Sequence, residues 1–213
     1  MTTTADLIIQ GFKELGLSSL FCLPGVQNDD FFDALYNEQD NVRPIQVRHE
    51  QAAGYMALGA AMATGKPQAY CVVPGPGFLN TTAALSTAYA VNAPVLALIG
   101  QIPAPAIGKD YGLLHEIPNQ DGILASLTKA NTRILNASEA HGKVHAVLSA
   151  LVNGRPRPVG IECPMNIWGT EVDSGQPLAP LTVQPVAPDP ALIEQAAAPV
   201  SYTHLTLPTI LLV

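Results

Sequence analysis

Basic residues, long apolar runs and leader-like features are scarce in this sequence. It holds 10 Lys and Arg against 17 Asp and Glu, which gives a net charge of −7, and it has no basic run. Because phosphates are bound by grouped Lys and Arg, we expect no nucleic-acid partner. No apolar run reaches the ~18 residues that a membrane-spanning helix needs. The opening MTTTADLIIQ does not resemble a secretory signal, so we expect a cytoplasmic protein without a membrane partner.

Cysteines and metal ligands are also sparse. Cys22, Cys71 and Cys163 are far apart and form no CxxC pair, which predicts reduced and buried thiols. His141 and His145 have the helical spacing of two metal ligands, but no third ligand accompanies them in the sequence. An exposed helix face is the simpler interpretation. We therefore predict no metal ligands in this chain.

Apolar residues, by contrast, make up 48% of the chain. Their spacing predicts helices at residues 7–15, 28–37, 51–64, 78–91 and 138–152. Short apolar runs predict strands at residues 19–25, 43–49, 68–73, 93–100 and 158–164. We expect Gly16 to end the first helix and Asn28 to cap the second. Alternating strands and helices predict an α/β fold with a parallel sheet and helices on both faces, a three-layer αβα arrangement whose strand order stays open.

The composition changes at residue 169. Residues 1–168 are expected to form the α/β domain. Residues 169–190 are rich in proline, which predicts an extended and semi-rigid linker. Asp189 and Pro190 suit the cap and first turn of a new helix, so residues 191–213 are expected to begin a further domain. From about Pro199 the sequence does not continue this helix, and a cloning or assembly artefact is one explanation.

Three turns have an unusual composition. They are LPGVQND at residues 23–29, VRHEQAAG at residues 47–54 and VVPGPGFLNTT at residues 72–82. In a parallel α/β sheet, ligands gather where such turns follow the carboxyl ends of strands. Glycines let the backbone approach a ligand closely, and prolines hold a loop rigid. We expect Glu50, at the start of a helix, and Asn80 to face one crevice at this edge.

Two long stretches resemble the pyrimidine-binding domain of thiamine diphosphate enzymes. They are RHEQAAGYMALGAAMATGKP at residues 48–67 and VVPGPGFLNTTAALSTAYAVNAPVLALIGQ at residues 72–101. The most similar branch is the group of acetolactate synthase, pyruvate oxidase and benzoylformate decarboxylase. The resemblance covers residues 5–164, and it is specific because both motifs occur in the right order.

The resemblance implies that Glu50 activates the cofactor. It matches the family's glutamate, which hydrogen-bonds the pyrimidine ring nitrogen, favours the imino tautomer and so promotes the ylid that attacks a 2-keto acid. The other residues that match the pyrimidine pocket are Pro24, Gly25, Gly75, Pro76, Gly77 and Asn80. The alternative is a first-turn glutamate that the helix dipole stabilises by ~0.3–1 kcal/mol.

A second candidate catalytic residue is His115, in GKDYGLLHEIPNQDGI. Acetolactate synthases tend to have a phenylalanine-glutamine pair before the glutamate that aligns with Glu116, and here Leu114 and His115 take those places. His115 can exchange protons near neutral pH, as histidines do in related decarboxylases. The alternative is a loop histidine without chemistry. Carboligation and decarboxylation of 2-keto acids therefore both stay open.

The sequence contains no Gly-Asp-Gly. In the family, a domain with a Gly-Asp-Gly…Asn-Asn module holds the diphosphate and Mg²⁺, and the cofactor lies between subunits. We thus expect thiamine diphosphate to need such a domain from another subunit, with Mg²⁺ held there, and we expect a homo-oligomer. FAD would belong to the full-length enzyme, and no residue here supports it.

Several interpretations of the whole chain stay open. It is expected to be either the front of a longer enzyme, which the linker favours, or a natural small subunit of a split 2-keto-acid decarboxylase. A non-catalytic α/β binding module is a further alternative. A nicotinamide-binding domain is another, although the GPG before Phe78 lacks the third glycine of a dinucleotide fingerprint.

Overall fold

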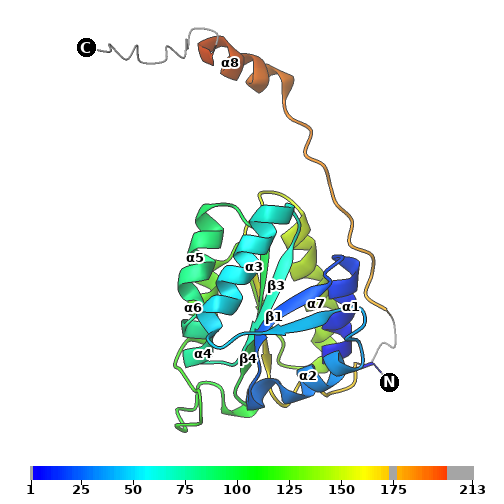
Figure 1. Cartoon of the computed structure of the whole chain (residues 1–213), viewed down its shortest axis with the longest axis vertical. Helices are drawn as coiled ribbons and strands as arrows, with labels where there is room; N and C mark the ends of the chain where they lie inside the picture. The colour runs from blue at the N-terminus through cyan, green and yellow to red at the C-terminus, as the bar shows by residue number, and fades with distance from the viewer. Residues whose placement is uncertain (1, 173–176, 201–213) are drawn as a thin grey trace, which may run out of the picture. The chain divides into compact units, whose positions relative to one another are not determined.

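The computed structural model describes residues 2–172 and 177–200. The chain divides into two units, Met1–Val183 and Gln184–Val213. The first unit contains the sheet and the helices that cover it (Figure 1). The described part of the second unit contains one helix, α8 (Pro190–Val200).

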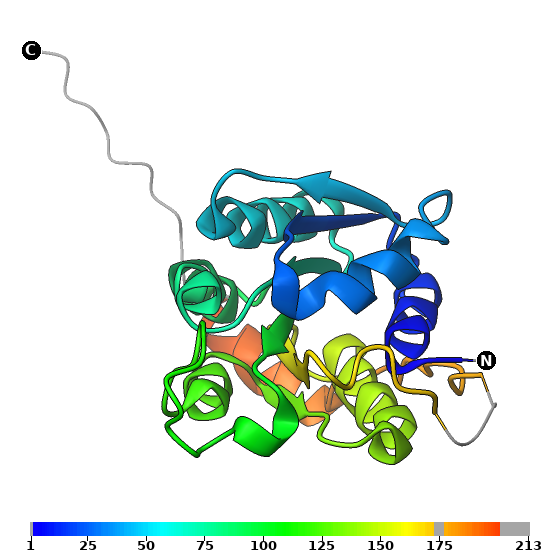
Figure 2. The same ribbon diagram turned by 90° about the horizontal axis from the view of Figure 1, so that it is seen from below.

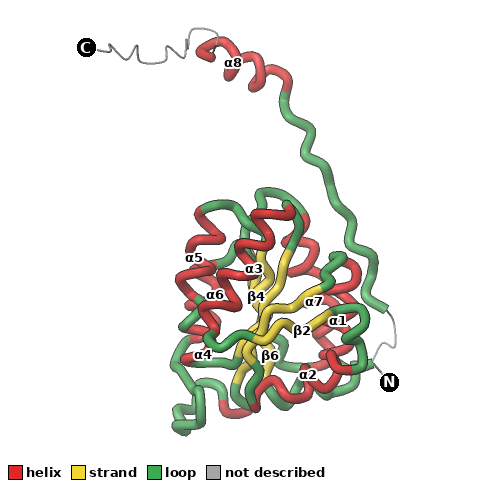
Figure 3. Tube along the Cα trace, viewed as in Figure 1, coloured by secondary structure: helices red, strands yellow, loops and turns green. Residues whose placement is uncertain are grey.

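Six parallel strands form the sheet of the first unit, in the order β2-β1-β3-β4-β6-β5. Figure 3 shows the strands in yellow between the helices. The predicted α/β fold is therefore confirmed, and the structure supplies the strand order. The strands are β1 (Ser19–Leu23), β2 (Arg43–Gln46), β3 (Gln68–Val72), β4 (Val95–Gln101), β5 (Ala130–Arg133) and β6 (Val159–Pro164).

Helices cover both faces of the sheet, which confirms the three layers (Figure 2). Successive strand residues point to opposite faces, so Leu20 and Cys22 lie in one core cluster and Phe21 lies in the other. The first cluster packs under α1 (Thr4–Glu14), α2 (Asp29–Tyr36) and α7 (Ala137–Val152). The second packs under α3 (Glu50–Thr64), α4 (Pro76–Leu79), α5 (Thr82–Ala90) and α6 (Gln120–Leu127).

The predicted helix at residues 78–91 is wrong in one respect, because two helices, α4 and α5, replace it. The break lies at Asn80 and Thr81. The Thr81 hydroxyl is buried, donates to the Phe78 carbonyl at 2.7 Å and hydrogen-bonds the Tyr70 hydroxyl at 2.9 Å. A threonine side chain that bonds a nearby backbone carbonyl competes with the regular helix, so a new helix starts at Thr82.

Helix ends were predicted with mixed success. Gly16 follows α1 with a φ of +67°, as expected of a helix-ending glycine. Asn28 precedes α2, but its side chain does not cap that helix and donates instead to the Val72 carbonyl at 2.9 Å. α6 and β5 were not predicted. β5 is an edge strand of four half-buried residues, ANTR, and so lacks an apolar run.

The cysteine prediction is confirmed. Cys22, Cys71 and Cys163 are free and buried. Burial raises the pKa of Cys22 to about 11, and it also raises the pKa values of Cys71 and Cys163. Thiols of this kind are inert small hydrophobes in the core.

The proline-rich stretch begins within the first unit. Thr3 pairs with Glu171 in an antiparallel bridge, and Val172 and Leu178 are buried in the first core cluster. Residues 177–189 contain no helix or strand. The division into domains at residues 168 and 190 stays a prediction.

The predicted start of the later helix is confirmed, because the Asp189 carboxylate accepts a hydrogen bond from the Ala191 amide at 2.9 Å at the start of α8. The helix continues through Pro199 to Val200, two residues further than expected. The rest of the predicted tail lies outside the described residues. No helix in residues 2–172 and 177–200 has the length and apolar character needed to cross a membrane.

Candidate functional site

The three unusual turns lie side by side. They follow β1, β2 and β3, which are neighbours in the order β2-β1-β3, and in parallel strands the carboxyl ends share one edge. The turn after β1 carries Pro24 and Gly25, the one after β2 leads to Glu50, and the one after β3 carries Gly75, Pro76 and Gly77. The structure therefore brings together all the predicted pyrimidine-pocket segments.

Glu50 and Asn80 are in direct contact. Glu50 is the first residue of α3 and is half-buried, and Asn80 follows α4. The Asn80 amide Nδ2 donates to Glu50 Oε2 at 2.9 Å. In the described part of the chain, this is the only hydrogen bond from a side chain to Glu50. The amide thus fixes the orientation of the carboxylate and leaves Oε1 available to another donor.

Two glycines make this packing possible. A Cβ atom at Gly77 would lie 2.6 Å from Val73 Cγ2 and 3.6 Å from Glu50 Oε1. A Cβ atom at Gly25 would lie 2.6 Å from Val73 Cγ1. Both turns therefore pack on the Val73 side chain at distances that only glycine allows. Pro24 and Pro76 are exposed beside them.

Gly75 joins this edge to the segment that carries His115. Its φ is +57°, and a Cβ atom there would lie 2.3 Å from the His115 carbonyl oxygen. His115 itself has a φ of +69° and is half-buried. The turn after β3 thus contacts both predicted catalytic residues, His115 through Gly75 and Glu50 through Gly77.

Gln120 was missed by the sequence analysis, although it holds the same turn in place. Its side chain is 1% exposed. Gln120 Oε1 accepts from the Gly75 amide at 2.8 Å, and Gln120 Nε2 donates to the Gly100 carbonyl at 3.0 Å. The side chain therefore links the turn after β3 to the end of β4. No local pattern marks this glutamine, because both partners are distant in sequence.

Gln27 was also missed. Its side chain lies between the turn after β1 and the His115 segment, with Oε1 3.2 Å from His115 Nδ1 and Nε2 donating to the Leu114 carbonyl at 3.3 Å. Its own carbonyl accepts from Trp168 Nε1 at 2.9 Å. Beside it lies an apolar cavity of about 230 Å³, lined by Val26, Gln27, Ile102, Pro103, Leu113, Leu114 and Met165.

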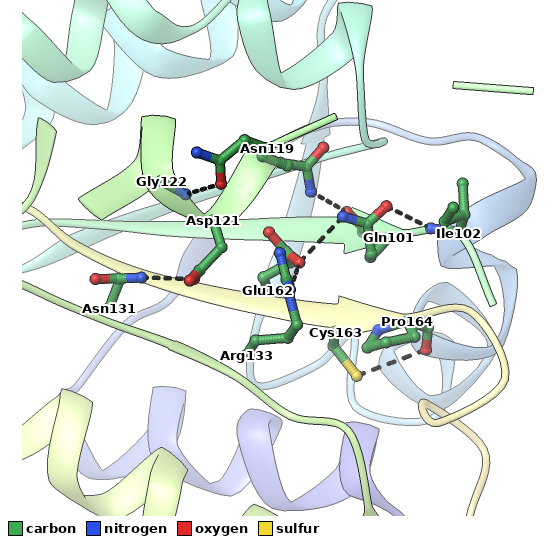
Figure 4. A network of polar contacts seen from close by, with 12 residues as sticks. Gln101, Ile102, Asn119, Asp121, Gly122, Asn131, Arg133, Glu162, Cys163 and Pro164 are labelled. Carbon is green, nitrogen blue, oxygen red and sulfur yellow. Dashed lines mark hydrogen bonds and ion pairs between the residues drawn. The ribbon is translucent and has the colours of Figure 1, made fainter. Parts of the chain in front are cut away.

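A buried polar network lies at the carboxyl ends of β4, β5 and β6 (Figure 4). Glu162 is 0% exposed, and its Oε1 accepts from Arg133 Nε and, at 3.1 Å, from Gln101 Nε2. Gln101 Oε1 in turn accepts from the Ile102 amide at 2.7 Å. A buried carboxylate needs such partners because an unpaired buried charge is costly. The network fixes the start of the segment that lines the apolar cavity.

Metal ligands are not grouped in the described residues, where no set of three or more His, Cys, Asp or Glu side chains is placed to hold an ion. Of the two histidines with ligand-like spacing, His141 contacts the Pro177 carbonyl through Nε2 at 3.0 Å. A contact to a backbone carbonyl fits a structural role better than a metal site.

Comparison with known proteins identifies the family. Residues 2–123 match the model described as thiamine pyrophosphate enzyme, N-terminal TPP binding domain. A probable acetolactate synthase large subunit of Methanocaldococcus jannaschii is 37% identical over 169 residues, which cover 79% of this chain and 28% of that protein. The acetolactate synthase isozyme 1 large subunit of Escherichia coli is 30% identical over 197 residues, which cover 92% of this chain and 32% of that protein.

A decarboxylase is among the relatives as well. A probable 2-ketoarginine decarboxylase of Pseudomonas aeruginosa is 29% identical over 170 residues, which cover 80% of this chain and 30% of that protein. The chain thus spans about a third or less of the length of these three relatives. The match over more than half of the chain, together with the six-stranded parallel sheet, shows that this chain belongs to the thiamine pyrophosphate enzymes and carries their N-terminal, pyrimidine-binding domain.

Proposed function

We propose that this chain provides the pyrimidine-binding half of a thiamine diphosphate-dependent carboligase or decarboxylase that acts on 2-keto acids, with Glu50 as the residue that activates the cofactor. The observation that carries the proposal is the Asn80–Glu50 hydrogen bond of 2.9 Å at the edge where the three turns meet. It orients the carboxylate and leaves Oε1 near Gly77, where a Cβ atom would lie 3.6 Å from this oxygen.

The residues present fit the pyrimidine ring of the cofactor. Glu50 Oε1 is an acceptor at a half-buried position, and a protonated ring nitrogen is a donor. A charge-assisted hydrogen bond in a site that excludes water is stronger than one between neutral groups in water. Gly25 and Gly77 lie in the turns beside this acceptor, and both pack closely on the Val73 side chain.

These contacts suggest which chemistry the cofactor supplies and which steps the residues of this chain perform. Thiamine diphosphate, when bound, supplies the electron sink for bond cleavage or formation at a 2-keto carbon. Glu50 Oε1 holds a proton at the pyrimidine nitrogen, and Asn80 keeps the carboxylate in the geometry that this requires. His115, on the neighbouring segment, accepts or holds a proton from a substrate group.

A second domain, which binds the diphosphate, completes this site. The sequence has no Gly-Asp-Gly, so the diphosphate and Mg²⁺ are to be held by a different domain, contributed by another subunit. That domain belongs either to a second copy of a longer enzyme that contains this chain or to a separate subunit of a split decarboxylase. Both arrangements make the chain part of an oligomer.

The test is the Glu50→Gln variant of the enzyme that contains this chain together with a diphosphate-binding domain. Glutamine keeps the size and the contact to Asn80 but cannot hold the proton at the ring. With thiamine diphosphate and Mg²⁺ present, 2-keto-acid consumption should fall by about 10²–10⁴-fold. Glu14→Gln, the same change at an exposed position of α1, should leave the rate unchanged. An unaltered rate in Glu50→Gln would favour a non-catalytic binding module.

A further inference from the structure

Gln27 is buried between two chain segments that are far apart in sequence. Its side chain is 3% exposed. Oε1 lies 3.2 Å from His115 Nδ1, Nε2 donates to the Leu114 carbonyl at 3.3 Å, and the backbone carbonyl accepts from Trp168 Nε1 at 2.9 Å. The first two contacts are to His115 and to its neighbour Leu114, and the third holds the backbone of the turn after β1. The glutamine is therefore held rigidly beside the imidazole ring.

The donor and acceptor roles in this contact follow from Leu114. A backbone carbonyl can only accept, so the amide NH₂ of Gln27 must face it. The other end of the amide, Oε1, is also only an acceptor, and it faces His115 Nδ1. His115 Nδ1 must then carry the hydrogen. In the neutral imidazole this leaves Nε2 with a lone pair and no hydrogen.

The backbone of His115 is fixed as well. Its φ of +69° is one that a non-glycine residue adopts only where the surroundings hold it. Those surroundings include Gly75, whose missing Cβ would lie 2.3 Å from the His115 carbonyl oxygen. His115 is thus held at two points, its ring by Gln27 at Nδ1 and its backbone by the turn after β3.

We propose that Gln27 is a positioning residue that fixes neutral His115 in its Nδ1–H tautomer and so presents Nε2 as a hydrogen-bond and proton acceptor. The reaction role of Nε2 rests on the proposed function, whereas the tautomer does not. An acceptor at Nε2 selects a ligand group that donates, such as a hydroxyl, over the carboxylate of a 2-keto acid. When a hydroxyl proton moves to Nε2, the imidazolium keeps its Nδ1–H bond to Gln27 and the oxygen retains the electron pair.

The tautomer can be read directly from the nitrogen shifts of the imidazole ring. Long-range ¹H–¹⁵N spectra of the full chain, recorded where the ring is neutral, should show a protonated Nδ1 and an unprotonated Nε2 for His115. His49 is an internal reference of the opposite kind, because its Nδ1 accepts from the Gln51 amide at 3.2 Å at the start of α3. An unprotonated Nδ1 at His115 would overturn the proposal.

Three variants separate positioning from a merely structural role. Gln27→Met removes the acceptor, so the His115 signals should move to those of mixed tautomers. Gln27→Glu loses the donor to the Leu114 carbonyl but keeps an acceptor oxygen for His115, so Nδ1 should stay protonated. Gln39→Met, at an exposed position, should leave the pattern unchanged. Thermal unfolding of each variant checks that it folds. If Gln27→Met alters nothing at His115, or if both Gln27 variants alter it equally, the assignment is wrong.

Kinetics of the complete enzyme then test the role in the reaction. Gln27→Met should lower kcat by up to about 10²-fold, the scale expected when a reacting group is misplaced, and Gln27→Glu should restore part of the loss. Equal losses in both variants would contradict positioning. Failure of the proposed function looks different, because Glu50→Gln would then leave the rate unchanged while the His115 nitrogen shifts still showed the fixed tautomer.

Discussion

Replacing Gly75 with alanine tests the link between the turn after β3 and the His115 segment. The backbone at Gly75 has φ +57° and ψ −120°, a region that alanine enters only at a cost of about 1–3 kcal/mol. The new Cβ would also lie 2.3 Å from the His115 carbonyl oxygen and 2.9 Å from its carbon. These are backbone atoms that cannot rotate away, so one segment must shift, at a further cost of about 1–3 kcal/mol.

The expected loss of unfolding free energy is therefore about 2–6 kcal/mol. For a chain of this size each kcal/mol lowers Tm by about 2–4 °C. Urea and thermal denaturation of the full chain measure both quantities. Because the displaced segment carries His115, the variant should also disturb the His115 ring signals.

Two other glycines separate the backbone cost from the collision. Gly16 has a φ of +67° but open space around it, so Gly16→Ala should cost only about 1–2 kcal/mol. Gly59 lies in α3 with open space and no unusual φ, so Gly59→Ala should stabilise by about 0.5–1 kcal/mol. If Gly75→Ala costs no more than Gly16→Ala, the close packing of Gly75 on His115 is refuted.

Two more predictions concern the core. Arg133→Leu leaves the buried Glu162 carboxylate without its ion-pair partner, so it should lower the free energy of unfolding by about 3–5 kcal/mol in urea denaturation. Arg48→Leu, at an exposed position, should change this free energy little. Equal effects of the two variants would contradict the network. Burial raises the pKa of Cys22 from 9.0 to about 11, so above pH 9 the unfolded chain binds fewer protons than the folded one. Stability should then fall as the pH rises from about 9 to about 11, and Cys22→Ala should reduce this dependence; an identical pH profile would show that Cys22 does not contribute.

Much of the fold could be predicted because local patterns encode it. Apolar spacing located five of the six strands, and Gly16 and Asp189 mark helix boundaries through contacts within their own segments. Glu50 and Asn80 could be proposed as site residues because the turns that carry them are unusual in composition. Their hydrogen bond then followed once β1, β2 and β3 were neighbours in the sheet.

Other features depend on partners that no local pattern identifies. The helix break at Thr81 involves a hydrogen bond with the Tyr70 hydroxyl. The Asn28 side chain donates to the Val72 carbonyl and does not cap α2. β5 escaped prediction because an edge strand buries only part of its surface and can be polar. At Thr81 and Asn28, a contact across the fold outweighs the local preference of the segment.

The sequence by itself determined the α/β class and the segments around the candidate site, and it pointed to Glu50 as the candidate carboxylate. Only the tertiary structure decided the strand order and, with it, the contacts of Gln27, Gln120 and Glu162. The physical reason is that periodicity reports which face of an element is buried, not which element covers it. Gln27 and His115 are 88 positions apart, so the bond that fixes the imidazole exists only when β1 and β4 lie on either side of β3.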